Sequence, residues 1–130
     1  MERYMAHLRY GAEIRTQQFL DSQEKEAGSL MYGGIRGGVV EAKPTIYALS
    51  TAVAVYVDEG SRFYHQQRLY DAMDLALGFV GRLQREDGSF DFPSCNFKSA
   101  ADTSFCFKRL YGAYRLLVRY DDGSGQMGLL

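Results

Sequence analysis

The chain has 130 residues, of which 46% are hydrophobic and 24% are charged, as in one soluble globular domain. Its net charge of −1, with Lys and Arg scattered along the sequence, excludes the basic footprint that sequence-independent nucleic-acid binding needs. No apolar run reaches the ~20 residues of a membrane span, and the charged first twelve residues do not resemble a signal peptide. We therefore expect a cytoplasmic protein, or part of a secreted or periplasmic one, that binds neither nucleic acid nor membrane.

Cysteine and histidine are too few for a metal site. Cys95 and Cys106 are not at ligand spacing, and the two histidines stand far from both. We expect no metal and no other cofactor, with Cys106 as a small core residue. The ten tyrosines and eight phenylalanines indicate either aromatic core edges or a cleft in which rings stack on a ligand.

The first half of the chain predicts two helices joined by a long loop. Residues 3–22 have an amphipathic pattern, and the apolar positions at helical spacing are Met5, Leu8, Ala12 and Phe19. Residues 23–43 lose this period and contain five glycines, which predicts a long loop with a function. Residues 44–57 begin with a proline and then contain no charge, which predicts a central helix covered on all sides. A buried strand is the alternative, but the length favours a helix.

The second half repeats this order. A turn at 58–61 leads to a third helix over 64–85, at whose start His65 is expected to be solvated. After a second long loop, Asp102 is a good N-cap for a fourth helix over residues 103–120. The expected apolar stripe of the third helix contains Leu69, Met73, Ala76, Val80 and Leu83. That of the fourth contains Phe107, Leu110, Tyr114 and Leu117.

The two halves, about 3–59 and 64–121, align with each other. Gln23 aligns with Gln84, the Gly-Ser-Leu at 28–30 aligns with the Gly-Ser-Phe at 88–90, and Thr45 aligns with Thr103. A helical unit that repeats after about 60 residues is typical of stacked helical hairpins. The first and third helices are amphipathic and so are expected to be outer, whereas the second and fourth are more apolar and so inner. Both long loops should then lie at one end.

A Gln-x-x-Asp-Gly-Ser-Phe string at a helix end, followed by a loop and a Thr-led apolar helix, resembles the repeat of α/α-toroid proteins. That group includes terpenoid cyclases, prenyltransferases and polysaccharide lyases and hydrolases. The fuller strings at 87–91, 96–99 and 102–105 are most similar to the N-terminal helical region of heparinase II/III-like bacterial proteins. The resemblance covers about residues 14–120. It implies an all-α fold in which two helical hairpins, four helices in all, form part of an incomplete toroid within a larger protein.

This resemblance implies a carbohydrate-active protein in which the chain forms part of the cleft for an acidic polysaccharide. Elimination or hydrolysis of uronate-containing glycans would belong to the full protein, which makes enzyme activity of this chain uncertain. Lyases of that group place an Asn-His pair in the cleft, yet Asn96 is followed by Phe97, so the catalytic residues are not assigned. One alternative is an isoprenoid cyclase or prenyltransferase, whose Asp-rich motif or zinc site is missing. The other alternative is a non-catalytic helical scaffold, and the absence of the Asn-His pair favours it.

The candidate substrate-binding residues lie at the ends of the two long loops. Helix N-termini carry free N–H groups and partial positive charge, which suit the carboxylate of an acidic sugar. An N-cap or a turn explains several of these side chains equally well. The candidates are Glu41, Lys43, Tyr47, Asn96, Lys98 and Asp102.

Other chemistries have weaker support. The Gly-Gly-Ile-Arg-Gly-Gly string at 33–38 lacks the Lys-Ser/Thr ending of a phosphate-binding loop. No pair of carboxylates points into the apolar layer, as a glycosidase site would require. A partial toroid leaves its first and last helices with open apolar flanks, so the chain is also expected to self-associate.

Overall fold

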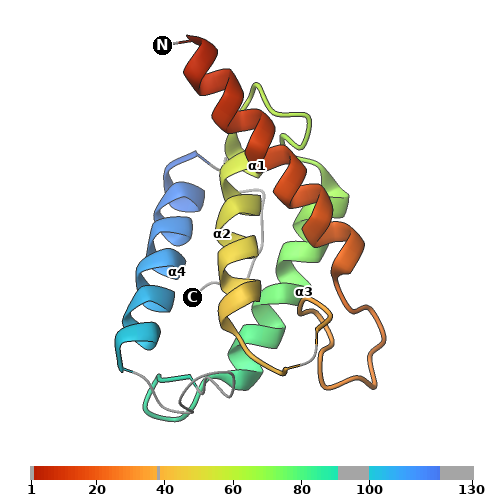
Figure 1. The fold of residues 1–130 in the computed structure, drawn as a ribbon, viewed down its shortest axis with the longest axis vertical. Coiled ribbons are helices and arrows are strands. Elements are labelled where there is room, and N and C mark those ends of the chain that lie inside the picture. Colours follow the sequence, from red (N-terminus) through yellow and green to blue (C-terminus); the bar gives the residue numbers. More distant parts are fainter. Residues whose placement is uncertain (1, 38, 91–99, 121–130) are drawn as a thin grey trace.

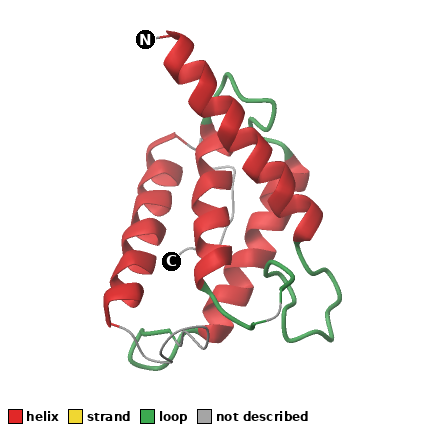
Figure 2. Cartoon of the chain, viewed as in Figure 1, coloured by secondary structure: helices red, strands yellow, loops and turns green. Residues whose placement is uncertain are grey.

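The computed structural model describes residues 2–37, 39–90 and 100–120, and within these ranges it contains four α-helices and no strand (Figure 2). The helices are α1 (Glu2–Ser22), α2 (Lys43–Val57), α3 (Gln67–Leu83) and α4 (Ala100–Tyr120). The predicted all-α class with four main helices is therefore confirmed. Three helix ends differ from the prediction by more than one residue. α3 begins at Gln67 and ends at Leu83, and α4 begins at Ala100, which places the backbone of Asp102 in the first helical turn rather than at the N-cap.

The four helices alternate in direction (Figure 1). α1 and α3 run toward one end of the molecule, and α2 and α4 start from that end, so α2 and α4 are parallel neighbours. The prediction that α2 and α4 begin at the same end is correct, whereas residues 91–99 of the second loop lie outside the described residues. α4 packs mainly against α2, whereas the described parts of α3 and α4 approach each other at fewer points.

α2 is the central helix, packed against each of the other three. Its buried residues lie on one side of the helix: Thr45, Ile46, Leu49, Ala52, Val53, Val55 and Tyr56. Pro44 is exposed in the first turn, where the missing N–H has no helical partner to lose. An uncharged helix of this kind is stable only when neighbours cover it, because each buried Leu, Ile or Val stabilises the fold by about 2 kcal/mol. The prediction of a central helix is confirmed, but the prediction that it is covered on all sides is wrong, because a half-buried strip along α2 remains open.

The core is divided between two clusters of buried residues. The larger joins α1, α2, α3 and α4 around Phe19, Leu49, Phe63 and Met73. The smaller lies near the long loops and joins Ile46 and Phe79 to Phe90 and Cys106. α3 buries the predicted stripe, with Leu69, Met73, Ala76 and Val80 inside and Leu83 half-buried. Cys106 is a core residue, as expected.

Two of the predicted apolar faces are only partly buried. Met5 and Leu8 are 53% and 45% exposed, because the N-terminal half of α1 extends past the bundle (Figure 1). In α4, Phe107 is 43% exposed, and the buried positions are Cys106, Ala113 and Leu117. The predictions that Met5, Leu8 and Phe107 are buried are therefore wrong, because the described neighbours cover each of these side chains only in part.

His65 lies before α3 and is not freely solvated as expected. Its ring stacks between Tyr64 and Tyr56, with centroid distances of 4.1 and 5.0 Å. Its backbone N–H donates to the carbonyl of Tyr56 at 3.0 Å, and its φ of 49° is in the left-handed region, which few residues with a side chain occupy. The stack and this hydrogen bond hold the chain in the reversal between α2 and α3.

The turns after α1 and α3 have the same hydrogen-bond pattern. In each, a glutamine Nε2 donates to the carbonyl of a glycine with positive φ: Gln23 to Gly33 (φ 87°) and Gln84 to Gly88 (φ 89°). The residue after each glutamine then forms a reciprocal backbone pair at 2.8 Å. Glu24 pairs with Gly33 and Gly34, and Arg85 pairs with Gly88 and Ser89. The Gln84 side chain thus ties the end of α3 to the turn that follows it.

This shared pattern corrects the alignment of the two turns. Gly33, rather than Gly28, is the counterpart of Gly88, because Gly28 has no positive φ. Leu30, which the sequence aligns with Phe90, is 82% exposed, whereas Phe90 is 1% exposed. The glutamine and its glycine are ten residues apart in the first turn and four apart in the second. Because the first loop contains extra residues, the sequence alignment of the two turns matched Gly88 with Gly28 instead of Gly33.

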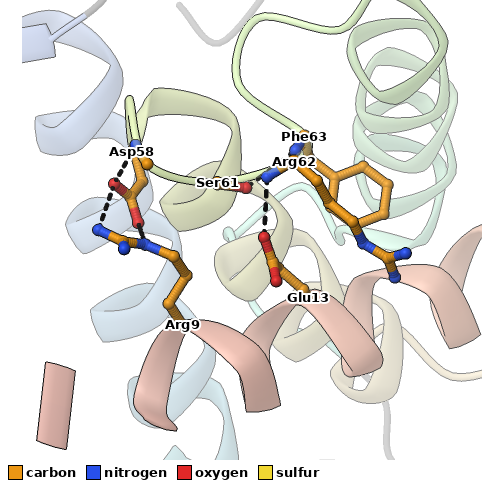
Figure 3. Close-up of polar contacts among 7 residues, drawn as sticks. Arg9, Glu13, Asp58, Ser61, Arg62 and Phe63 are labelled. Carbon is orange, nitrogen blue, oxygen red and sulfur yellow. Dashed lines mark hydrogen bonds and ion pairs between the residues drawn. The ribbon is translucent and has the colours of Figure 1, made fainter. Parts of the chain in front are cut away.

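An ion pair fastens α1 to the turn between α2 and α3 (Figure 3). Nε of Arg9 donates to Oδ2 of Asp58 at 2.6 Å and Nη2 donates to Oδ1 at 3.1 Å. One helical turn further, a carboxylate oxygen of Glu13 accepts the backbone N–H of Arg62 at 2.8 Å. The hydrogen bonds from Arg9 hold the pKa of Asp58 below its ordinary value. These contacts lie at the opposite end from the long loops and are structural.

Candidate functional site

A groove runs between α1 and α4, with the open strip of α2 as its floor. α1, α2 and α4 each line the groove with residues at helical spacing, so one face of each of these three helices meets there. The groove has two adjoining parts, which share Arg15, Tyr47, Thr51 and Arg109. Their volumes of about 550 and 760 Å³ are in the range of small-ligand sites.

The part near the long loops is the more polar one. Its lining includes the polar side chains of Gln18, Ser22 and Thr51 beside Arg15 and Arg109. Phe19, Ile35 and Ala48 complete the wall toward the core. Hydroxyl and amide groups of this kind exchange hydrogen bonds with the hydroxyls of a sugar.

Three cations lie along the groove, and the described residues that line it include no carboxylate. Arg15 comes from α1, whereas Lys108 and Arg109 come from α4. The guanidinium of Arg109 lies 4.6 Å from the centre of the Tyr47 ring, a cation–π contact that holds it over the floor of the groove. Because nothing acidic in this lining neutralises the cations, the groove attracts anions.

Two hydroxyls on the floor are oriented by the backbone of α2. Oγ of Ser50 donates to the carbonyl of Tyr47 at 2.9 Å, and Oγ1 of Thr51 donates to the same carbonyl at 3.2 Å. Since each hydroxyl gives its only proton to the helix, its oxygen is left as an acceptor for a ligand. The floor therefore accepts hydrogen bonds from ligand hydroxyls, while the arginines donate to ligand carboxylates.

The second part of the groove, farther from the loops, is mainly apolar. Its apolar lining consists of Leu8, Ala12, Ala54, Phe105, Ala113 and Leu116. Lys108 and Gly112 lie at the α4 side. Both parts expose more apolar than polar surface, and the second part is the more apolar of the two. Arg15 and Arg109 lie where the parts meet.

Of the residues predicted to bind substrate, Tyr47 is in the groove. Glu41 and Lys43 are half-buried at the start of α2 and are not among the residues that line it. The backbone of Asp102 is in the first turn of α4. Asn96 and Lys98 lie outside the described residues. The candidate site is therefore centred on the side of α2 rather than on its N-terminus.

The sequence reasoning missed Arg15, Lys108 and Arg109. The cations were judged to be scattered, which is true along the chain, but the parallel packing of α2 and α4 brings α1 and α4 to the two sides of one floor. One signal was present in the sequence. Residues 103–120 contain four cations and no carboxylate, which is unusual for an exposed helix in a chain of net charge −1.

The described lining contains no carboxylate, histidine or cysteine, and its titratable side chains are those of Tyr47, Lys108 and the two arginines. Within residues 2–37, 39–90 and 100–120, no three His, Cys, Asp or Glu side chains are grouped so that they could hold a metal ion. In the same ranges no helix is both long and apolar enough to cross a bilayer.

Comparisons with protein-family models, with curated proteins and with solved structures find no match to this chain.

Proposed function

We propose that this chain binds an acidic polysaccharide in the groove between α1 and α4. The observation that carries the proposal is the set of three cations, Arg15, Lys108 and Arg109, along a groove with no described carboxylate in its lining. Guanidinium groups pair with the carboxylates of uronic acids through two parallel hydrogen bonds. The acceptor hydroxyls of Ser50 and Thr51 suit the neutral hydroxyls of the same sugars.

The helix arrangement supports a place for this chain in an α/α-toroid protein. Parallel α2 and α4, with α1 and α3 antiparallel to them and both long loops at one end, is the order of inner and outer helices in such proteins. In that setting the groove forms part of the substrate cleft. Elimination or hydrolysis of a uronate-containing glycan would then depend on residues other than the groove lining.

Isothermal titration with tetragalacturonate tests the binding. We expect binding that weakens as salt is added, because the contacts are ionic. Arg109→Ala should lower the affinity about tenfold, the usual effect of losing one charged hydrogen bond. Arg115→Ala is the matched control, since Arg115 is on the same helix beside an aromatic ring, Tyr111, but does not line the groove. No heat at millimolar ligand, or equal loss in both variants, would rule out this function.

A further inference from the structure

A purely polar glycan bound through Lys108 and Ser50 would leave the apolar side chains of the second part of the groove, such as Leu8 and Leu116, without a matching group. This part is also not a closed gap in the core, because its walls stay open: Leu8 is 45% exposed and Phe105 is 55% exposed. On the floor, Ala54 is half-buried, and its small side chain leaves room between the walls. The groove therefore offers a hydrocarbon group apolar contacts on three sides.

The two arginines fix where a charged group would lie relative to that apolar part. Arg15 and Arg109 line both parts of the groove, so they stand at the boundary between the more polar and the more apolar part. A ligand with its carboxylate at this boundary extends in one direction over Gln18 and Ser22 and in the other over Leu8, Ala54 and Leu116. Charge complementarity at the boundary thus sets the orientation of the ligand.

We infer that the ligand of this groove is an amphiphilic acidic glycan, one whose uronate unit carries an acyl or alkyl chain. The acidic head follows from the proposed function, and the chain is the new element. The acyl or alkyl group of the ligand lies in the more apolar part of the groove between α1 and α4, with Lys108 on the α4 side. The affinity then depends on both the carboxylate and the hydrocarbon group of the ligand, in contrast to a site that recognises only the negative charge.

Three matched probes separate the two ends: octyl β-glucuronide, which has both groups, methyl β-glucuronide, which has no chain, and octyl β-glucoside, which has no carboxylate. Binding is measured by titration calorimetry below the micelle concentration of each probe. We expect octyl glucuronide to bind at least tenfold more tightly than either of the others, because a buried hydrocarbon chain adds to the affinity of the carboxylate.

Variants of α1 test whether the hydrocarbon group of the ligand lies against Leu8. Leu8→Gln should remove most of the gain from the octyl group while leaving the affinity for methyl glucuronide unchanged. Met5→Gln is the matched control, because Met5 is an exposed apolar residue of the same helix that does not line the groove. Both positions are exposed, so neither substitution should affect folding, and the circular dichroism spectrum of each variant checks this.

The outcomes distinguish this inference from the proposed function. Equal affinity for octyl and methyl glucuronide, with tetragalacturonate still bound through Arg109, overturns the amphiphilic ligand and leaves the acidic polysaccharide. Octyl glucoside bound as tightly as octyl glucuronide overturns the inference as well, since the acidic group then adds nothing. Absence of tetragalacturonate binding, with octyl glucuronide bound and dependent on Leu8, overturns the polysaccharide. A dimer that Leu8→Gln abolishes, with no octyl gain, identifies a second copy as the occupant and overturns the inference.

Discussion

Gln23 and Gln84 occupy equivalent places in two turns, but they differ in burial. Gln23 is buried, and its Nε2 donates to the carbonyls of Gly33 at 2.9 Å and of Ala72 at 2.8 Å. Its amide thus joins the end of α1 to the first loop and to α3. Gln84 makes one exposed bond of 3.0 Å to Gly88. The same residue type therefore contributes to tertiary structure in one turn and to local structure in the other.

Gln23→Leu should destabilise the fold by about 3 kcal/mol, because two buried carbonyls lose their donor. Gln84→Leu should cost less than about 1 kcal/mol, since water replaces its single exposed bond. Urea denaturation followed by circular dichroism measures both values. Equal losses in the two variants would contradict the view that burial separates these glutamines.

The pair of Arg9 and Asp58 makes stability depend on pH. The pKa of Asp58 is lowered in the folded state, chiefly by the hydrogen bonds from Arg9, so its contribution is fully present above the ordinary aspartate pKa of about 3.9. That contribution is lost as the pH falls through the lowered folded pKa. Asp58→Asn should therefore be less stable than the parent at pH 7, and the difference should vanish at the acidic end. The effect should be small, because both side chains are partly exposed.

Thermal midpoints at several pH values between 7 and 2 measure this difference, since the folded pKa of Asp58 lies below its ordinary value. Asp71→Asn is a suitable control, since Asp71 is an exposed residue of α3 whose carboxylate accepts from Gln67, a neutral side chain. A constant difference between the parent and Asp58→Asn over the whole range would mean that the ionised pair does not contribute.

Individual residues were predicted correctly where their role is local. Asp58 and Gly60 were expected in a turn, and the Asp58 carboxylate accepts the N–H of Gly60 at 3.0 Å. His65 was predicted wrongly because its stack involves Tyr56, a residue of the preceding helix. No local pattern encodes a contact that forms only when the chain reverses direction.

At the scale of elements, the loop after α1 is fixed by two glycines against α3. A side chain at Gly33 would place its Cβ 2.2 Å from the carbonyl oxygen of Leu75, and one at Gly34 would contact the Phe79 ring at 2.7 Å. The loop backbone therefore lies directly on the helix. Arg82 adds a hydrogen bond from its guanidinium to the carbonyl of Tyr32.

Gly33→Ala should strongly destabilise the protein, by about 3 kcal/mol or more, because both the positive φ and the contact with Leu75 oppose a Cβ. Gly28→Ala is the matched control in the same loop. It has no positive φ and no atom within 4 Å of the new Cβ, so its stability should be unchanged or slightly higher. Denaturant midpoints compare the two. A tolerated alanine at 33 would mean that the loop does not lie on α3.

Helices could be predicted from the sequence because their signals are local and strong. The uncharged residues 45–57 predicted a central helix and the apolar stripe of α3 predicted one buried face, and the structure has both. The loops could not be assigned in the same way. Gly28 and Gly33 look alike as letters, and only the packing on α3 selects the one that adopts a left-handed backbone. The extra residues between Gln23 and Gly33 concealed the match.

At the scale of the whole molecule, α4 presents an exposed face that is both aromatic and basic. Tyr111 is 62% exposed and Val118 is 64% exposed, with Lys108, Arg115 and Arg119 also exposed on this helix. Apolar side chains of this kind favour association with another surface. Two copies that meet through this face also bring like charges together, which opposes the association.

The chain should therefore self-associate weakly, and the association should strengthen as salt screens the cations. Sedimentation velocity at rising protein concentration, in low and high salt, measures this. Tyr111→Lys with Val118→Lys should shift the protein toward monomer, whereas Tyr10→Lys, an exposed aromatic of α1, should not. A strictly monomeric protein at high concentration would contradict open flanks, and with them the toroid arrangement.

The groove is the feature that sequence reasoning could least predict. Its cations come from the first and last helices, and its floor consists of half-buried residues of a helix expected to be fully covered. Tyr47 was selected because it follows a loop, yet its role in the groove depends on Arg109, which reaches it from α4. The groove depends on contacts between helices that are far apart in the sequence. The periodicity of apolar residues describes each helix separately and does not predict such contacts.

The paired hydrogen bonds that close both turns have a consequence for how the chain tolerates change in length. The contacts hold the two ends of each turn, at Gln23 with Gly33 and at Gln84 with Gly88, and make no demand on the number of residues between them. The first turn already accommodates the longer span without disturbing α2 or α3. Its exposed tip around Leu30 is thus a natural place for an inserted epitope or fluorophore, leaving the helical scaffold to fold as before.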